Sequence, residues 1–180
     1  MLDGNNVRLR PVKRSDISYF LKWFNDPEVT QYLSMYLPMT EMAEEKYIEE
    51  LGDSRVGKDV SFVIEAVEGD VCTPIGTLGL HGINAKDHHA TFGIAIGEKD
   101  YWSKGFGTEA ARLVIRYGFE QLNLHRINSS ALAFNERSLR LHKKVGFTEE
   151  GRQRKAMFRN GEYHDHVGFG ILREEWKAQQ

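Results

Sequence analysis

Residues 101–110 read Tyr-Trp-Ser-Lys-Gly-Phe-Gly-Thr-Glu-Ala, a glycine-rich loop that follows an apolar segment and opens an amphipathic one. Gly105 and Gly107 remove side chains where a backbone must come close to a ligand. The amphipathic run after them predicts a helix, whose free N–H groups and positive dipole end attract anions. This stretch therefore predicts a phosphate-binding loop.

The same residues also fit a dinucleotide-binding fingerprint, because Gly105, Gly107 and Ala110 satisfy G-x-G-x-x-G/A. A dinucleotide fold needs the glycines directly after a strand and an acidic residue at the end of the next strand. Here residues 98–104 intervene, and the expected strand 125–133 ends without a carboxylate. The surroundings of the loop thus favour another phosphate-containing cofactor.

A second segment, residues 135–147, reads Asn-Glu-Arg-Ser-Leu-Arg-Leu-His-Lys-Lys-Val-Gly-Phe. Together the two segments resemble the Gcn5-related N-acetyltransferase (GNAT) superfamily, in which a Q/R-x-x-G-x-G/A loop binds the coenzyme A pyrophosphate and N-x-x-S…K-x-G-F forms the next helix and turn. The resemblance extends from residues 7–11 to residues 160–163. The glycine loop looks most like the branch that contains ribosomal-protein N-terminal acetyltransferases (RimJ/RimL-like) and bacterial spermidine acetyltransferases.

Composition bounds the class of protein. A chain of 180 residues with 41% hydrophobic residues can bury one core, so we expect a single domain over residues 1–180. No apolar run reaches the roughly 18 residues that span a bilayer, and the first 15 residues lack a signal-peptide pattern. The lone Cys72 permits no internal disulfide. We expect a cytoplasmic protein without a membrane partner.

Charge is unevenly distributed although its total is only −2. Residues 1–100 hold 10 Lys/Arg and 17 Asp/Glu, whereas residues 101–180 hold 14 and 9. A basic second half suits an anionic cofactor, and an acidic first half either steers a cationic acceptor or is an ordinary solvated surface. No basic stripe interleaved with aromatic residues suggests nucleic acid.

The periodicity of apolar residues predicts an α/β (α+β) fold, with an open, mixed and largely antiparallel sheet flanked by helices. Ser15 is expected to cap the first helix, and Ala43, Tyr47, Ile48 and Leu51 to form the buried stripe of the second. The expected strands are residues 7–12, 61–67, 75–83, 88–97, 126–133, 147–158 and 163–172. The expected helices are residues 15–24, 40–51, a helix from the glycine loop to about residue 122, and residues 136–145.

The resemblance implies how acetyl-coenzyme A is held. The strand Thr91–Gly97 would carry a bulge and splay from the next central strand, so that backbone groups of this strand meet the pantetheine arm and one N–H polarises the acetyl carbonyl. The implied cofactor-binding residues are Ile94, Ala95, Ile96, Trp102, Ser103, Lys104, Gly105, Phe106, Gly107, Thr108, Asn135, Ser138 and Lys144. Asn135 is also a preferred helix N-cap residue, and both roles can hold.

Two residues are expected to be catalytic, His142 and Ser138. His142 stands where many family members have a tyrosine that acts as general acid, and an unperturbed imidazole titrates near pH 6.5; a surface histidine with water as the acid is the alternative. The sequence does not decide which residue is the general base that takes the proton of the amine. Relatives often place a glutamate where Thr91 stands, and the candidates here are His81, His88, His89, Glu28 and Glu41.

We therefore expect an acetyl-coenzyme A-dependent N-acetyltransferase in which a primary amine, either a protein N-terminus or a small polyamine-like molecule, attacks directly in a ternary complex. The alternative is a catalytically weak coenzyme A-binding sensor or structural module. No metal is expected, since His164 and His166 share a strand face without further ligands at suitable spacing. Cys72 is expected to be a structural thiol. The oligomeric state stays open, and a homo-oligomer is compatible with the sequence.

Overall fold

The computed structural model describes residues 1–35, 37–53 and 58–178. The described residues form a sheet of eight strands in the order β1-β2-β3-β4-β5-β6-β8-β7. Every neighbouring pair is antiparallel except β5 and β6, which run parallel. The strands are β1 (Leu2–Asp3), β2 (Val7–Pro11), β3 (Val60–Glu68), β4 (Val71–Asn84), β5 (His89–Ile96), β6 (Arg126–Leu132), β7 (Thr148–Arg159) and β8 (Glu162–Leu172). The predicted mixed, largely antiparallel sheet and its central antiparallel strands are confirmed.

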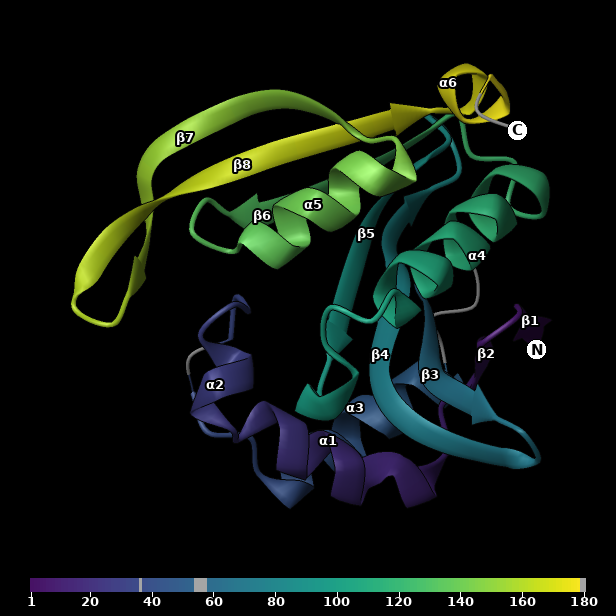
Figure 1. Ribbon diagram of the computed structural model, residues 1–180, viewed down its shortest axis with the longest axis vertical. Coiled ribbons are helices and arrows are strands. Elements are labelled where there is room, and N and C mark those ends of the chain that lie inside the picture. The colour runs from purple at the N-terminus through teal and green to yellow at the C-terminus, as the bar shows by residue number, and fades with distance from the viewer. Residues whose placement is uncertain (36, 54–57, 179–180) are drawn as a thin grey trace.

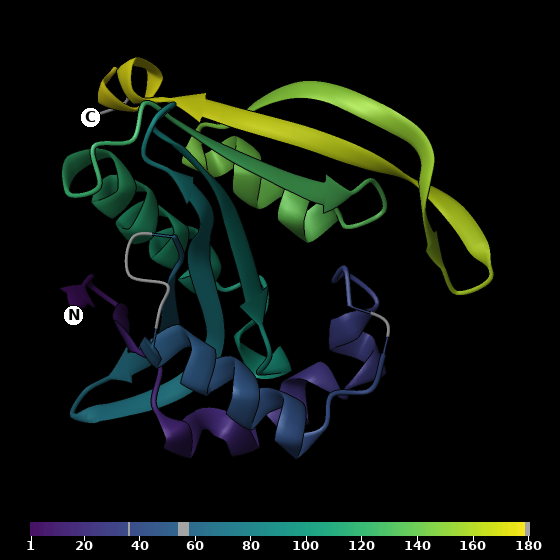
Figure 2. The same cartoon turned by 180° about the vertical axis from the view of Figure 1, so that it is seen from behind.

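Helices cover both faces of this sheet (Figures 1 and 2). One face carries α4 and α5, and the other carries α1 and α3, with α2 beside the open end of β5. The helices are α1 (Ile17–Phe24), α2 (Pro27–Thr30), α3 (Glu41–Asp53), α4 (Phe106–Glu120), α5 (Glu136–Val145) and α6 (Arg173–Lys177), with short 3₁₀ turns η1 (Arg14–Asp16) and η2 (Lys99–Tyr101). Within the described ranges no helix combines the length and apolarity that a membrane span requires.

Alternation along the strands assigns residues to the two faces. Phe62, Leu78, Leu80 and Phe92 join the large core against α4, whereas Val63 packs with Phe20 and Trp23 of α1. Since successive strand residues point to opposite faces, the odd positions of β5 face α1 and its even positions face α4. This division decides which part of the site each residue of β5 can reach.

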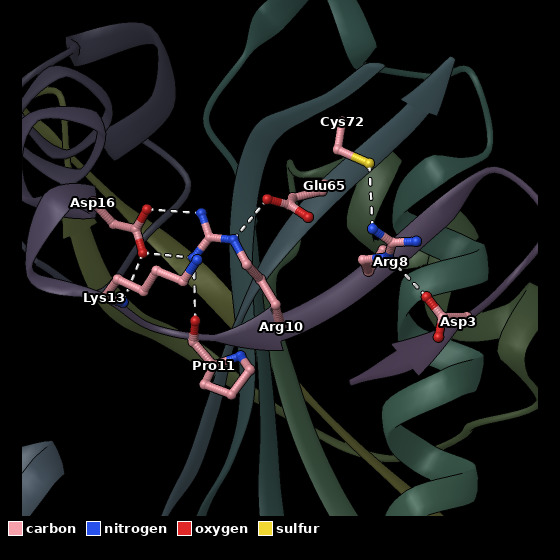
Figure 3. Close-up of polar contacts among 8 residues, drawn as sticks. All are labelled: Asp3, Arg8, Arg10, Pro11, Lys13, Asp16, Glu65 and Cys72. Atoms are coloured by element: carbon pink, nitrogen blue, oxygen red, sulfur yellow. Dashed lines mark hydrogen bonds and ion pairs between the residues drawn. The ribbon is translucent and has the colours of Figure 1, made fainter. Parts of the chain in front are cut away.

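A buried ion cluster anchors β2 (Figure 3). The Arg10 guanidinium donates to both carboxylate oxygens of Asp16 at 2.8 Å and to Glu65 at 2.6 Å. Asp16 also accepts the Lys13 N–H at 2.7 Å, at the start of η1. The N-cap residue of α1 is Asp16, without a side-chain cap hydrogen bond, so the predicted Ser15 cap is wrong. Cys72 lies 3.6 Å from an Arg8 nitrogen at the neighbouring edge.

Of the buried stripe predicted for α3, Ile48 is confirmed and Ala43 is wrong. Ala43 is exposed and Glu44 is buried, with Ile48 one turn later packed against the α1 cluster. Burial raises the pKa of Glu44, which favours its neutral form. The expected stripe residues Tyr47 and Leu51 have side chains outside the described part of the structure.

The central feature is the separation of β5 from β6. The two strands pair only through His89↔Arg126, Ala90↔Ile127 and Thr91↔Asn128, and Figure 1 shows them diverging beyond this point. The predicted splay is therefore present. The predicted bulge in residues 91–97 is wrong, because β5 stays in regular register with β4 from Thr91 to Ile96 and the irregularity lies between His81 and Asn84.

Candidate active site

The glycine loop adopts a strained conformation directly before α4. Gly105 is the N-cap residue with φ 97°, and Ser103 has φ 61°, so two positions of the loop are left-handed. Left-handed backbone favours glycine and is often retained at functional sites. The loop thereby presents the N-terminal end of a 15-residue helix, where N–H groups and the helix dipole favour an anion.

A cavity of about 510 Å³ begins at this loop and extends between β5 and β6. Its lining includes Ile94 and Ile96, which face α4, and Thr91, Gly93 and Ala95, which face α1. Residues from both faces of one strand can line one cavity only if the cavity passes through the sheet. The separation of β5 from β6 opens that passage.

Backbone alternation shows which groups of β5 face the opening. The Gly97 N–H donates to Ile75 of β4 at 2.9 Å, so Ala95, two residues earlier, directs its backbone groups toward β4 as well. The carbonyls of Phe92 and Ile96 accept from Ser129 at 3.0 Å and from Trp102 at 2.7 Å, on the other side. Ile94 therefore turns its N–H and C=O into the opening. Of the three strand residues expected to hold the cofactor through backbone groups, Ile94 and Ile96 have the suitable orientation, Ala95 does not, and the Ile96 carbonyl already accepts from Trp102.

The helix α5 brings the second motif to the opposite wall of the cavity. The Asn135 side chain caps this helix by accepting the Ser138 N–H at 3.1 Å, and Gly146 ends it with φ 101°, both as the sequence predicts. Asn135, Ser138, His142 and Lys144 all line the cavity. The cap fixes Ser138, and with it the first turn of the helix, at the cavity wall.

His142 lies at the edge of this wall with both ring nitrogens engaged. Its Nδ1 is 2.7 Å from the Ser138 carbonyl and its Nε2 is 2.7 Å from the Ser129 hydroxyl. A carbonyl can only accept, so Nδ1 carries the hydrogen, and Nε2 of the neutral ring shares the single hydroxyl hydrogen of Ser129 with the Phe92 carbonyl. The ring stacks on Phe169 with centroids 4.4 Å apart. Ser129 also reaches the Phe92 carbonyl, so the group bridges β6, α5 and β5 where the strands part.

The expectation of an unperturbed imidazole at position 142 is wrong. His142 is only 1% exposed, and burial lowers its pKa, although the hydrogen bond to the Ser138 carbonyl acts in the opposite direction. The neutral ring has its one N–H committed to that carbonyl and holds no proton for a sulfur atom. Its geometry suits a bridge between secondary-structure elements better than a proton donor.

Arg137 joins the two sides of the cavity through aromatic contacts. Its guanidinium carbon lies 3.8 Å from the centroid of the Trp102 ring and 4.9 Å from that of Tyr32, which follows α2. All three residues line the cavity. Cation–π contacts of this kind contribute about 0.5–2 kcal/mol. Arg137 and Tyr32 are not among the residues predicted from the sequence.

A second, smaller cavity of about 260 Å³ lies on the α1 face of the sheet. Its lining includes Phe24, Met35, Ser61, Gly79 and His81, and it shares Gly93, Ile94, Ala95 and His81 with the first cavity. The described residues that line it include neither Asp nor Glu. The two cavities therefore meet at β5, one on each side of the opening.

Most of the predicted cofactor-binding residues line the first cavity. They are Ile94, Ala95, Ile96, Trp102, Ser103, Gly105, Gly107, Thr108, Asn135, Ser138 and Lys144. Phe106 instead packs against Tyr101 with centroids 5.1 Å apart, and the Lys104 ammonium lies 5.9 Å from the Tyr101 ring centroid; neither lines the cavity. The lining residues Ser129 and Ser130 went unpredicted because their segment carries no motif, and Leu141 because it is an apolar residue within the second motif.

The five candidates for the base separate clearly. His81 lines both cavities, whereas His88 and His89 lie where β5 begins, at its end still paired with β6. Glu28 forms an ion pair with Lys99, and Glu41 is exposed at the start of α3. His164, considered as a metal ligand, packs on Phe134 with centroids 4.5 Å apart. Among the described residues, no three or more His, Cys, Asp or Glu side chains gather as a metal site.

Comparison with known proteins agrees with this geometry. The Acetyltransferase (GNAT) domain family matches residues 6–148. The spermidine N(1)-acetyltransferase of Escherichia coli K12 is 30% identical over 99% of this chain and 92% of its own. YdaF of Bacillus subtilis, proposed to be a ribosomal N-acetyltransferase, is 34% identical over 63% and 60%. A structure of Vibrio cholerae spermidine N-acetyltransferase with CoA and spermine superposes with a TM-score of 0.86 at 26% identity, covering 97% of this chain and 99% of that one.

Proposed function

The chain belongs to the GNAT acetyltransferase family, and from this premise we propose that it transfers the acetyl group of acetyl-coenzyme A to a primary amine by direct attack within a ternary complex. The observation that carries the proposal is the cavity that passes through the sheet between β5 and β6. It gives two co-substrates access to one point from opposite faces. Direct attack needs this arrangement, because both reacting atoms must be held about 3–3.5 Å apart.

The residues present fit coenzyme A on the α4 side. A Cβ built on Gly107 would lie 3.3 Å from Leu141 and 3.6 Å from Ile96, so the missing side chain leaves the helix backbone accessible at the cavity wall. Arg137, Arg140 and Lys144 add positive charge along the same lining. We propose that the loop and the start of α4 bind the pyrophosphate, and that the Ile94 backbone pairs with the pantetheine arm.

The chemistry requires a polarised thioester carbonyl, an uncharged amine and stabilisation of the leaving thiolate. The Ile94 N–H faces the opening and can donate to the carbonyl oxygen. Ser138 lines the cavity with its hydroxyl on the first turn of α5 and can donate a hydrogen bond to the sulfur. His142 keeps a part in this proposal by holding the Ser138 carbonyl and the Ser129 hydroxyl, which fixes the helix against the open strands.

The acceptor side favours an amine whose body carries no further positive charge. A polyamine bound there would bring additional ammonium groups, and a desolvated cation needs a paired anion. The described lining of the second cavity offers neutral side chains. This supports an N-terminal α-amine or a short neutral-bodied amine as the acceptor, even though relatives that are 30% and 26% identical to this chain are spermidine acetyltransferases.

A thiol-release assay tests the proposal. Acetyl-coenzyme A is offered with spermidine, with simple alkylamines and with peptides that begin with Ser or Ala, and the acetylated product is identified by mass spectrometry. We expect turnover with the neutral-bodied amines and peptides and weaker turnover with spermidine. Faster turnover with spermidine contradicts the acceptor assignment. Tight acetyl-coenzyme A binding with no turnover on any amine supports the alternative of a coenzyme A-binding sensor or structural module.

A further inference from the structure

The cross-strand neighbourhood of His81 marks a site that the motifs do not predict. In β4 and β5, His81 pairs with Thr91 and Gly79 pairs with Gly93. These four residues share one face of the sheet because His81 and Gly79, like Thr91 and Gly93, are two residues apart. This face carries α1, so the His81 ring lies on the acceptor side of the opening.

Gly79 makes the space that the His81 ring occupies. A Cβ on Gly79 would lie 2.8 Å from His81 Nε2 and 2.9 Å from Cε1, closer than real Cβ atoms approach. A Cβ on Gly93 would lie 3.8 Å from Cδ2 and 3.9 Å from Nε2, an ordinary van der Waals contact. The ring is therefore directed along the sheet toward the Gly79–Gly93 pair, where the two cavities meet. A side chain at position 79 would exclude the ring from this place.

A serine hydroxyl also lies near the His81 ring. Ser61 pairs with Gly79 in register and lines the second cavity. Its Oγ is buried and has no hydrogen-bond partner among the described residues. A row of Ser61, Gly79 and Gly93 thus crosses three strands beside the His81 ring. This row offers an amine a hydroxyl to contact and an imidazole to receive its proton.

We propose that His81 is the general base for the acceptor amine, an inference that rests on the proposed acetyl transfer. His81 takes a proton from the bound ammonium group, and the resulting amine nitrogen forms its bond to the acetyl carbon as the carbon–sulfur bond breaks. The second proton that the nitrogen loses passes through water to the thiolate, which leaves with a hydrogen bond from Ser138, and His81 releases its own proton to solvent. Proton and electron counts balance without a further reactant.

Two variants test this assignment. His81→Gln removes the base at similar volume, and His125→Gln is the matched control at an exposed histidine outside both cavities. We expect His81→Gln to lower kcat/KM about 100-fold at neutral pH, as removal of a positioned base does, with unchanged acetyl-coenzyme A affinity by calorimetry. The loss should shrink at high pH and with amines of low pKa, because these arrive unprotonated. The control should retain wild-type rates.

The unsubstituted protein supplies a second readout. Its kcat/KM should fall at acidic pH, where a protonated His81 no longer accepts the proton of the amine, and His81→Gln should remove that acid limb. The other titratable or charged side chains that line the two cavities are Tyr32, Tyr101, Arg137, Arg140, His142 and Lys144. His142 titrates below the usual range because burial lowers its pKa.

Several outcomes overturn the assignment while leaving acetyl transfer intact. They are wild-type kcat/KM in His81→Gln, a uniform loss at every pH, loss of acetyl-coenzyme A affinity together with rate, or a wild-type profile without an acid limb. The last outcome decides the question even if the variant fails to fold. A wild-type protein that acetylates no amine overturns the proposed function and this inference together.

Discussion

The α4 side and the α1 side of the opening offer different kinds of groups to the ligands proposed for them. On the α4 side the binding groups belong largely to backbone, which is shaped by Gly105, Gly107 and the start of α4 within one short segment. On the α1 side the lining side chains come from α1, β3, β4, β5 and the segment after α2. A site made of backbone groups uses residues that are consecutive in the sequence, whereas a site made of side chains combines residues that are far apart in the sequence. The cofactor is therefore easier to predict than the acceptor.

The largest expected effect comes from closing the backbone site. Gly107→Val should weaken acetyl-coenzyme A binding by at least about 100-fold, or about 2.7 kcal/mol. Its Cβ would already lie 3.3 Å from Leu141, and the added methyl groups would occupy the cavity wall. Calorimetry measures the affinity, and circular dichroism checks the fold. Gly151→Val is the control, because a Cβ there meets nothing within 4 Å.

An unchanged affinity in a folded Gly107→Val protein would show that the cofactor does not bind against this helix. The loop and the start of α4 would then not form the backbone site for the cofactor.

His142 tests whether the bridge between the two sides is structural or catalytic. His142→Ala should destabilise the protein by about 2–4 kcal/mol, because it leaves a buried cavity and removes the partner of Ser129. His142→Asn keeps a donor for the Ser138 carbonyl but has no titratable proton. We expect it to retain kcat within about 10-fold. A loss of about 100-fold in a folded Asn variant would indicate a proton donor instead.

The same residue gives stability a dependence on pH with a defined sign. Burial holds the pKa of His142 below that of an unfolded histidine, which is about 6.5. As pH falls through this value, the unfolded chain takes up a proton that folded His142 does not, so the free energy of unfolding decreases until the folded pKa is reached. Urea unfolding between pH 7.5 and pH 5 should show a shallower decrease in His142→Asn than in wild type. Equal slopes would contradict the burial argument.

Arg137 provides a smaller test, because it contacts residues on both sides. Arg137→Ala should raise KM about 5-fold for acetyl-coenzyme A and for the amine, since it removes contacts to Trp102 and Tyr32 worth about 1 kcal/mol. Arg140→Ala is the matched control. Arg140 lines the same cavity but pairs with Glu136 at 3.0 Å on α5. It should change the KM of acetyl-coenzyme A alone. If both variants change the two KM values in the same way, Arg137 contributes only its positive charge and not its aromatic contacts.

The smallest effect is expected from the acidic helix α3. None of its described residues lines either cavity, and Glu49 pairs with Arg14 at 2.9 Å. The double change Glu41→Gln and Glu45→Gln should alter kcat/KM less than about 2-fold. It should also leave the salt dependence of kcat/KM unchanged around an ionic strength of about 0.1 M, where the Debye length is about 10 Å. A clear loss confined to polycationic acceptors would restore the steering hypothesis.

Particular residues show how far prediction reached. The glycine loop, the Asn135 cap and the Gly146 end were predictable because each depends on neighbours within a few positions. In α3 the predicted stripe was wrong at Ala43, because tertiary packing buried the neighbouring Glu44 instead, whereas Ile48 packs as predicted. The predicted bulge in residues 91–97 was wrong, because β5 pairs regularly with β4 from Thr91 to Ile96. The opening arises because β6 no longer pairs with β5 beyond Thr91.

The amino-acid sequence by itself determined the family, the α/β fold and the position of the cofactor loop, because glycine conformations, helix caps and strand alternation are local properties of the chain. Only the tertiary structure decided the surroundings of the histidines. It buried His142 between Ser138 and Ser129, which lowers its pKa, and it placed His81 over the Gly79–Gly93 pair at the meeting point of two cavities. Burial and cross-strand register depend on residues far apart in the chain, and these set both the protonation of an imidazole and the groups it can reach.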